Sequence, residues 1–260
     1  MEAGQRGVAG VQKTEGIILR RQEIRETSLI LITFTRDLGK IHGLVKGVRG
    51  SRAAVPWYLE PMTLQSLIVY ERRRSTMALI SGFDLIDPFD PIRKDFTRTA
   101  YAGLLLDLTD VMTETADPHP EVFLLLLNGL RALADGGDPR SVARFFEANL
   151  LRMTGILPET RALSLSAGAR ASLTQIFQTP ADRLTRLRLG REVEEELRGV
   201  LQGVFREILD SELKSRSFLA AVGLEGIPET IYSANVVWAS GTPNHFLGPR
   251  RGPSTGIHGR

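Results

Sequence analysis

The sequence predicts an α+β chain in which a small β-barrel precedes an all-α helical domain. Residues 13–86 form short segments rich in β-branched and aromatic residues, with apolar positions that alternate. Residues 87–222 instead carry apolar side chains at spacings of three and four. The change falls at Asp87-Pro88-Phe89-Asp90-Pro91, where two prolines are incompatible with continued strand pairing. The chain therefore divides into two structural parts at this point.

Strands are expected at residues 16–20, 27–35, 40–48, 63–70 and 76–86. Short strands that follow one another so closely, without helical spacing, are typical of the oligonucleotide-binding (OB) barrel. An SH3-like barrel is the alternative that the same pattern could build. Residues 1–12 are glycine-rich and lack an apolar core, so we expect a flexible N-terminus that is no signal peptide.

A helical bundle is expected to follow the barrel. Ile92, Phe96, Ala100, Leu104, Leu108 and Val111 form one apolar stripe, which predicts a single helix of about twenty residues. Further helices are predicted at residues 120–134, 141–153 and 166–178, and a last one from Gly190 toward Phe218. Residues 223–260 are rich in Gly, Pro, Ser and Thr, and this composition predicts a disordered tail.

The chain contains no cysteine, which excludes disulfides and cysteine-ligated metal sites and fits a reducing cytosol. The longest purely apolar run, at residues 122–127, is far shorter than a membrane span. We therefore expect a soluble, cytoplasmic protein with no membrane partner.

Positive charge is concentrated in the first part. Residues 13–86 have a net charge of +5, whereas residues 87–222 have a net charge of −3. No acidic side chain occurs between Leu38 and Leu59, a stretch that contains Lys40, Lys46, Arg49 and Arg52. A cationic, glycine-rich strand and loop of this kind indicate a surface for a polyanion whose backbone comes close.

Other cations and one aromatic residue are candidates for the same role. Arg72, Arg73 and Arg74 lie at a predicted hairpin turn and either solubilise it or contact phosphates beside the basic strand. Trp57 follows the basic loop and either stacks on a base or packs in the core. Lys214 and Arg216, near the end of the bundle, either bind phosphate or complement a helix dipole, and the dipole role is slightly favoured.

Catalytic motifs are scarce. Gly39-Lys40 is no phosphate loop, because Phe34 stands where the leading glycine is needed and Ile41 replaces Ser or Thr. The four histidines are scattered, with no second histidine at a metal-ligand spacing. We therefore expect no enzyme activity, no cofactor and no metal.

Several segments, in order and spacing, resemble the bacterial DNA repair and recombination mediator family RecO. They are Glu15-Gly16-Ile17-Ile18-Leu19-Arg20-Arg21, Phe34-Thr35-Arg36, Gly39-Lys40-Ile41, Val45-Lys46-Gly47-Val48-Arg49, Leu59-Glu60-Pro61 and Leu213-Lys214-Ser215-Arg216-Ser217-Phe218-Leu219. The resemblance extends over about residues 13–222. It implies an OB fold followed by a helical domain and a nucleoid-associated protein that binds single- and double-stranded DNA.

The same resemblance implies strand annealing and help in replacing single-strand-binding protein with recombinase. The partners it implies are a RecR-like protein and the acidic C-terminal tail of single-strand-binding protein. Lys46 and Arg49 fall on the family's basic motif, so a DNA-contact role is implied for them. Many members also have a four-cysteine zinc module. Here residues 160–166 lead directly from Gly155-Ile156-Leu157-Pro158-Glu159 to the next predicted helix, so we expect a variant without zinc.

The leading hypothesis is thus a non-enzymatic DNA-binding mediator whose contacts are to phosphates. The alternative is a protein-interaction adaptor whose basic barrel and helical bundle dock acidic partner peptides. RNA binding stays open as a third possibility, because no residue is predicted to read a 2′-hydroxyl.

Overall fold

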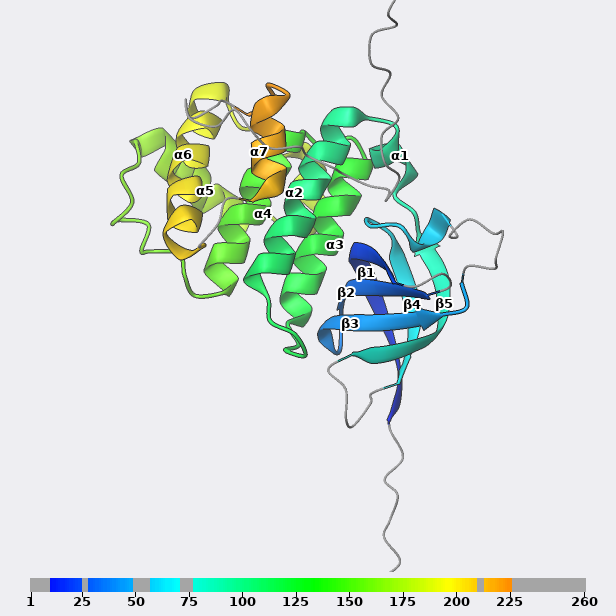
Figure 1. Cartoon of the computed structure of the whole chain (residues 1–260). Helices are drawn as coiled ribbons and strands as arrows, with labels where there is room; N and C mark the ends of the chain where they lie inside the picture. The colour runs from blue at the N-terminus through cyan, green and yellow to red at the C-terminus, as the bar shows by residue number, and fades with distance from the viewer. Residues whose placement is uncertain (1–9, 25–27, 49–56, 71–76, 210–212, 226–260) are drawn as a thin grey trace, which may run out of the picture.

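The computed structural model describes residues 10–24, 28–48, 57–70, 77–209 and 213–225. These residues form a β-barrel and a group of helices that lie side by side (Figure 1). Helices α2 (Phe96–Met112) and α3 (Pro120–Ala134) lie next to the barrel. The predicted α+β fold class is confirmed.

The barrel is closed and has the strand order β1-β2-β3-β5-β4. Its strands are β1 (Val11–Ile24), β2 (Ser28–Thr35), β3 (Gly39–Lys46), β4 (Leu64–Tyr70) and β5 (Ala78–Asp87). Strand β1 is long enough to pair with β4 through its first half and with β2 through its second half. Strands β3 and β5 pair in parallel, with Gly43 opposite Ala78. This topology confirms the OB barrel over the SH3-like alternative. Strand β1 also includes Val11 and Gln12, which belong to the segment predicted to be flexible.

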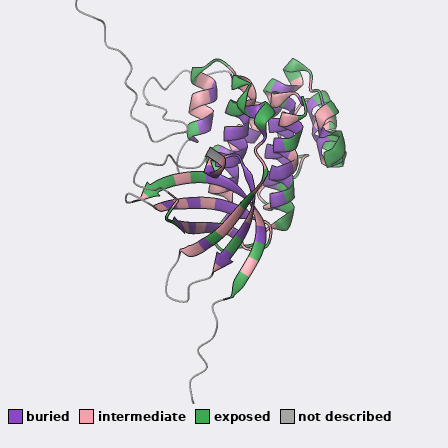
Figure 2. Ribbon diagram, turned by 90° about the vertical axis from the view of Figure 1, so that its right-hand side faces the viewer, coloured by how far each residue is buried: buried purple, intermediate pink, exposed green. Residues whose placement is uncertain are grey.

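Alternate residues of the strands fill the barrel. Ile18, Leu31, Val45, Leu67 and Ile80 are each at most 2% exposed and pack together in its interior. Because side chains alternate between the two faces of a strand, the residues between them point outward. The alternation of buried and more exposed positions is visible along the strands in Figure 2.

The helical part contains more elements than the sequence pattern predicts. Besides α2 and α3, it contains α1 (Asp90–Arg93), α4 (Pro139–Met153), α5 (Ala167–Gln178), α6 (Arg191–Ile208), α7 (Lys214–Ala221) and the 3-10 turn η2 (Ala181–Arg186). Another 3-10 turn, η1 (Trp57–Leu59), lies between β3 and β4. The single helix predicted from Ile92 is divided in two, because the Asp95 side chain accepts a hydrogen bond from the Arg98 N–H at 3.0 Å and caps a new helix.

The helix predicted from Gly190 toward Phe218 is also divided in two. Helix α6 ends at Ile208, and α7 begins at Lys214. The Asp107 carboxylate, on α2, accepts a hydrogen bond from the Ser215 N–H at 3.1 Å. A residue 108 positions away in the sequence therefore accepts the hydrogen bond of a free N–H group in the first turn of α7. Helical periodicity alone could not indicate this start of a new helix.

One hydrophobic cluster spans the junction between the barrel and the helices and is separate from the cluster that fills the barrel. Ile17, Leu19 and Phe34 of the barrel belong to the same cluster of buried residues as the interior of the helical part. The Phe34 and Phe123 rings lie 6.5 Å apart, and the guanidinium of Arg36 lies 5.3 Å from the centre of the Phe123 ring. The two parts are thus packed together rather than joined by a free linker.

The segment between α2 and α3 docks on the start of β3. The Ala116 N–H donates to the Lys40 carbonyl at 2.9 Å, and Thr115 forms a parallel bridge with Lys40. Gly39 lies beside this segment with a φ of 66°, and a Cβ atom there would be 2.1 Å from the carbonyl oxygen of Asp117. A glycine is therefore needed at this position for two separate reasons.

One arginine holds the loop between α4 and α5. The guanidinium of Arg170 donates to the Leu163 carbonyl at 3.1 Å, to the Leu165 carbonyl at 3.2 Å and to the carbonyl of Thr160. The Glu196 carboxylate accepts from the N–H and hydroxyl of Ser166 at 2.5 Å and 2.7 Å. These contacts hold the short connection in place. Many family members would have a zinc module at this position.

We expect Arg170→Ala to lower the free energy of unfolding by about 2 kcal/mol, because hydrogen bonds from a charged group are lost and carbonyls are left unsatisfied. Urea denaturation would measure this change. The control is Arg161→Ala in the same loop, where the side chain is 84% exposed and removal should change stability little. EDTA should leave the melting temperature of the unmodified protein unchanged, and a large decrease would contradict the prediction that zinc is absent.

Candidate nucleic-acid interface

The outward face of β2 and β3 presents one exposed cation. In β3, Ile41, Gly43 and Val45 point into the barrel, and the residues between them point outward. Lys46 is exposed at the end of the strand, opposite Ser28 of β2. OB barrels bind oligonucleotides on the face of strands 2 and 3 and on the loops that connect strands 1–2 and 4–5. Lys46 lies on that face.

Most of the other predicted contacts lie outside the described residues. These are Arg49 and Arg52, which follow β3, and Arg72, Arg73 and Arg74, which connect β4 to β5. Trp57 begins η1, but its side chain is also outside the described part of the chain. The chain order places Arg72, Arg73 and Arg74 in the strand 4–5 connection, one of the two loops used by OB barrels. Their roles stay predictions.

Lys40 is occupied by a partner within the protein. Its ammonium group donates to the Asp110 carbonyl oxygen at 2.5 Å and to the Asp110 carboxylate at 3.1 Å, and its side chain is 11% exposed. Arg20 of β1 contacts the same carboxylate at 2.7 Å. The expectation that Lys40 faces a polyanion therefore differs from the structure, because α2 brings an acidic residue onto the outward face of β3.

Lys214 and Arg216 lie in the first turn of α7, not at a helix C-terminus. Cations complement the dipole at the C-terminal end of a helix, so the dipole interpretation is wrong. Lys214 is exposed. Arg216 is 11% exposed and pairs with Glu147 and, at 3.9 Å, with Glu225. Only Lys214 of this pair is displayed on the surface.

A buried charge network was missed by the sequence interpretation. Arg144 is fully buried and contacts Glu147 at 2.9 Å, Glu194 at 3.4 Å and Glu225 at 2.7 Å. Glu225 therefore packs into the helical part, although residues 223–260 were predicted to be a disordered tail. The sequence signal was the Arg144–Glu147 spacing of three, with both residues flanked by apolar side chains on the predicted helix.

Burial and charge act in opposite directions on this network. Burial lowers the pKa of Arg144, but the carboxylates of Glu147, Glu225 and Glu194 outweigh burial and raise it. Burial raises the pKa of Glu194, and the charge of Arg144 opposes that increase. The arginine thus stays charged and holds acidic groups from three separate segments of the chain.

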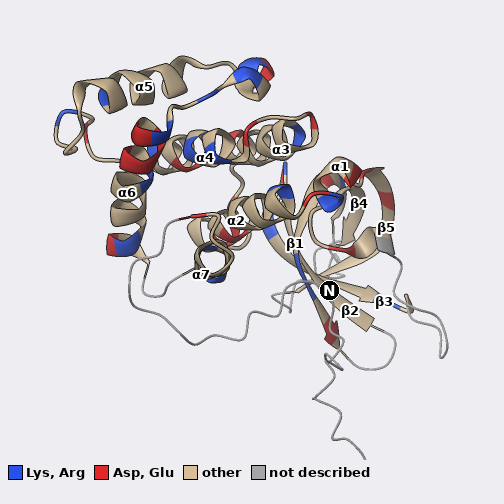
Figure 3. Cartoon of the chain, turned by 90° about the horizontal axis from the view of Figure 1, so that it is seen from above, with Lys and Arg blue, Asp and Glu red and all other residues tan. Residues whose placement is uncertain are grey.

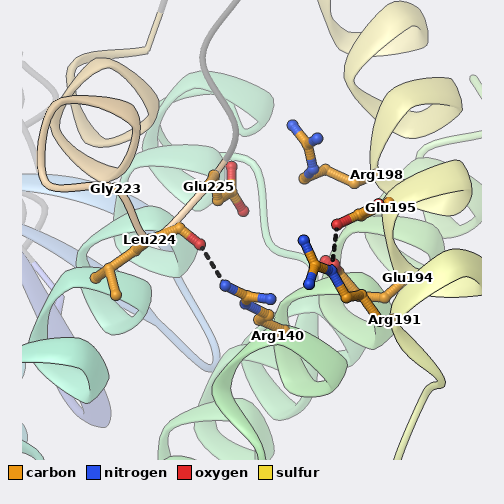
Figure 4. A pocket seen from close by; sticks show the side chains of 8 residues that line it. All are labelled: Arg140, Arg191, Glu194, Glu195, Arg198, Gly223, Leu224 and Glu225. Carbon is orange, nitrogen blue, oxygen red and sulfur yellow. Dashed lines mark hydrogen bonds and ion pairs between the residues drawn. The ribbon is translucent and has the colours of Figure 1, made fainter.

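A pocket of about 320 Å³ lies next to this network (Figure 4). Its walls come from the start of α4, the first half of α6 and the segment that follows α7. Arg140 donates to the Leu224 carbonyl at 3.2 Å, and Arg191 pairs with Glu195 at 2.9 Å. The lining mixes arginines with glutamates, and Arg140 and Arg191 already have partners within the chain.

Across the described ranges, no group of three or more His, Asp or Glu side chains is placed to hold a metal ion. In the same part of the chain, no helix has both the length and the apolar character needed to cross a membrane.

Comparison with known proteins agrees with this architecture. A family model described as "Recombination protein O N terminal" matches residues 10–89, and one described as "Recombination protein O C terminal" matches residues 93–162. These ranges correspond to the barrel and to the first helices after it.

Curated relatives extend the similarity. The chain is 34% identical to the DNA repair protein RecO of Syntrophus aciditrophicus over 146 residues, which is 56% of each chain. It is 26% identical to the DNA repair protein RecO of Moorella thermoacetica over 268 aligned residues, covering 90% of this chain and 99% of the relative. The match to the Bacillus velezensis protein of the same name is 33% over 147 residues, covering 56% of this chain and 57% of the relative. With its barrel, its helical part and both family models in the same order, the chain belongs to the RecO family.

Proposed function

We propose that this chain is a non-enzymatic DNA repair and recombination mediator that binds DNA through the outward face of its barrel. The observation that carries the proposal is the exposed Lys46 on the strand 2–3 face of an OB barrel in a RecO-family chain. The relatives are named DNA repair proteins. The basic residues that follow β3 and β4 in the sequence support a surface for phosphates.

The proposed activity is binding of single- and double-stranded DNA and annealing of complementary strands. Neutralising phosphates on both strands lowers their repulsion, so annealing of this kind needs no ATP. The proposed contacts are Lys46, Arg49, Arg52, Arg72, Arg73, Arg74 and Lys214, with Trp57 as a stacking residue. We leave Lys40 and Arg216 out of this set, because Asp110 and Glu147 hold them.

The proposed partners are a RecR-like protein and the acidic C-terminal tail of single-strand-binding protein. With them, the chain would help to load recombinase onto coated single strands in the cytoplasm, at the nucleoid. The arginines around the pocket support docking of a carboxylate-bearing peptide on the helical part.

The test is annealing of complementary strands coated with their single-strand-binding protein. We expect the Lys46→Ala/Arg49→Ala/Arg52→Ala variant to lose most of the annealing, and the salt slope of single-strand affinity to fall by about 2, since each phosphate contact contributes about 0.7. The matched control is Arg131→Ala/Arg161→Ala/Arg206→Ala, which removes three exposed charges from the helical part. Circular dichroism would establish that both variants are folded.

If the two triple variants anneal strands equally well, the outward face of the barrel is not the DNA-binding site. If the unmodified protein does not anneal strands at all, the mediator proposal fails. The acidic-peptide adaptor would then take its place, with the pocket of mixed arginines and glutamates as its docking site.

A further inference from the structure

A second cationic surface lies between α5 and α6, away from the residues proposed above to contact DNA, and its C-terminal end adjoins the pocket described above. Arg183 and Arg186 belong to η2, Arg188 follows it, and Arg191 begins α6. We call these four residues the arginine ridge. The sequence from Arg183 to Arg191 contains no acidic residue, although residues 87–222 as a whole have a net charge of −3.

Buried leucines fix the ridge to the helical part. Leu184 is 0% exposed and Leu187 is 6% exposed, whereas the arginines beside them are exposed. The Leu189 N–H donates to the Ser141 hydroxyl at 3.0 Å, which ties the segment to the start of α4. Turn η2 also packs against α3. The segment is thus anchored through its apolar side chains and displays its charges to solvent.

The local backbone spaces the arginines along the segment. In a 3-10 helix, side chains at i and i+3 lie on one line about 6 Å apart, which applies to Arg183 and Arg186. After η2, leucine and arginine alternate at residues 187–189, as expected for an extended segment in which every second side chain points outward. A row of cations suits a linear polyanion better than a single small anion, because its members do not converge on one point.

The charges of the ridge are largely unneutralised. Within the described part of the chain, no carboxylate lies in ion-pair distance of Arg183, Arg186 or Arg188. Arg188 donates to the carbonyls of Thr185 and Leu187, both at 2.8 Å, and these groups leave its charge uncompensated. Arg191 pairs with Glu195, but the Arg191 side chain is 82% exposed in that pair. An unpaired row of this kind produces a positive surface potential that attracts a polyanion.

The ridge lies on the far side of the helical part from the barrel. Viewed from above in Figure 3, the segment between α5 and α6 lies beyond α3 and α4, and the barrel lies on the opposite side of these helices. A strand bound to the outward face of β2 and β3 therefore does not reach the ridge by continuing along the same surface.

We propose that the arginine ridge is a second binding site for a nucleic-acid phosphate backbone, separate from the barrel. Guanidinium groups match phosphate oxygens through paired hydrogen bonds. Leu184 and Leu187 are buried and Leu189 is partly buried against the helical core, so the ridge offers little apolar surface to anchor a peptide, and this favours a phosphate backbone over an acidic peptide. The proposal rests on the proposed function in one respect, since a second site lets one molecule hold two strands.

The test uses the full chain and an immobilised oligothymidine. Protein is bound to this first strand, excess is washed away, and capture of a second, labelled oligothymidine is measured. The two strands cannot pair, so capture reports a second binding site. We expect Arg183→Glu/Arg186→Glu to bind the first strand normally and to lose about tenfold in second-strand capture, with a shallower salt dependence. The matched control, Arg161→Glu/Arg206→Glu, reverses two exposed arginines elsewhere and should behave like the unmodified protein.

Equal capture by the ridge variant and the control would overturn the ridge as a nucleic-acid site. Failure of the unmodified protein to capture a second strand would do the same. A polyglutamate peptide that binds the unmodified protein but not the ridge variant, while second-strand capture is the same in both, would assign the ridge to acidic peptides and overturn the proposal. The barrel variant Lys46→Ala/Arg49→Ala/Arg52→Ala tests the proposed function separately, because it should affect the first strand.

Discussion

Arg144→Met should lower the free energy of unfolding by about 3–5 kcal/mol, the range for removing one partner of a buried ion pair. Arg144 is 0% exposed and faces Glu147, Glu194 and Glu225, which are also buried. Without the guanidinium, these carboxylates stay in a desolvated site, although Arg216 still contacts Glu147 and Glu225. Methionine fills much of the same volume, so the loss reports charge more than packing.

Urea denaturation followed by circular dichroism would measure this loss. Arg131→Met is the matched control, because it makes the same substitution at an exposed position on α3 and should change stability by less than about 0.5 kcal/mol. A further variant, Arg144→Met/Glu147→Gln/Glu225→Gln, removes two of the stranded charges and should regain part of the loss. If Arg144→Met were as stable as the control, the network would have no role in holding the helices together.

Gly39→Ala should be the second most damaging substitution, at more than about 2 kcal/mol. The left-handed conformation at Gly39, with φ at 66°, costs a residue with a side chain about 1–2 kcal/mol. The added Cβ would also be 2.1 Å from the Asp117 carbonyl oxygen, and both are held close by the backbone. The barrel turn and the α2–α3 segment would then have to separate, which also disturbs the contact between Ala116 and Lys40.

The variant Gly47→Ala separates the conformational cost of a left-handed residue from the cost of the steric clash. Gly47 has a φ of 71°, and among the residues that the structure describes a Cβ there would meet no atom within 4 Å. It therefore measures the conformational cost alone, and the additional loss in Gly39→Ala measures the clash at the junction. Thermal unfolding of both variants would give the comparison. Equal melting temperatures would mean that the α2–α3 segment shifts at no cost and that the clash is not real in solution.

The elements that the sequence predicts well are those with local signals. The barrel strands follow from alternation of apolar residues, and the helix at residues 120–134 agrees with α3 at both ends because Pro120 and Gly136 mark its limits. The breaks after Arg93 and after Ile208 were missed. The apolar spacing continues across both, and the groups that cap the new helices are polar side chains that periodicity does not register.

In the candidate site, too, the sequence predicts the features that depend on local patterns and misses those that depend on distant partners. The exposure of Lys46 follows from its place in an alternating strand. The pairing of Lys40 with Asp110 and the burial of Arg144 and Glu225 depend on partners 70 and 81 positions away, which no local pattern contains. The arginine ridge was visible in the sequence as arginines interleaved with leucines, but only the burial of the leucines gives that pattern a meaning.

The hydrophobic cluster that spans the junction between the barrel and the helices has a mechanical consequence. Because Phe34 and Phe123 belong to one packed interior, the outward face of β2–β3 and the arginine ridge are attached to the same hydrophobic cluster. If each of the two proposed sites holds a strand, the fold itself sets the separation between the strands. Their effective concentration would then depend on this packing, and no flexible linker would have to be ordered to bring them together.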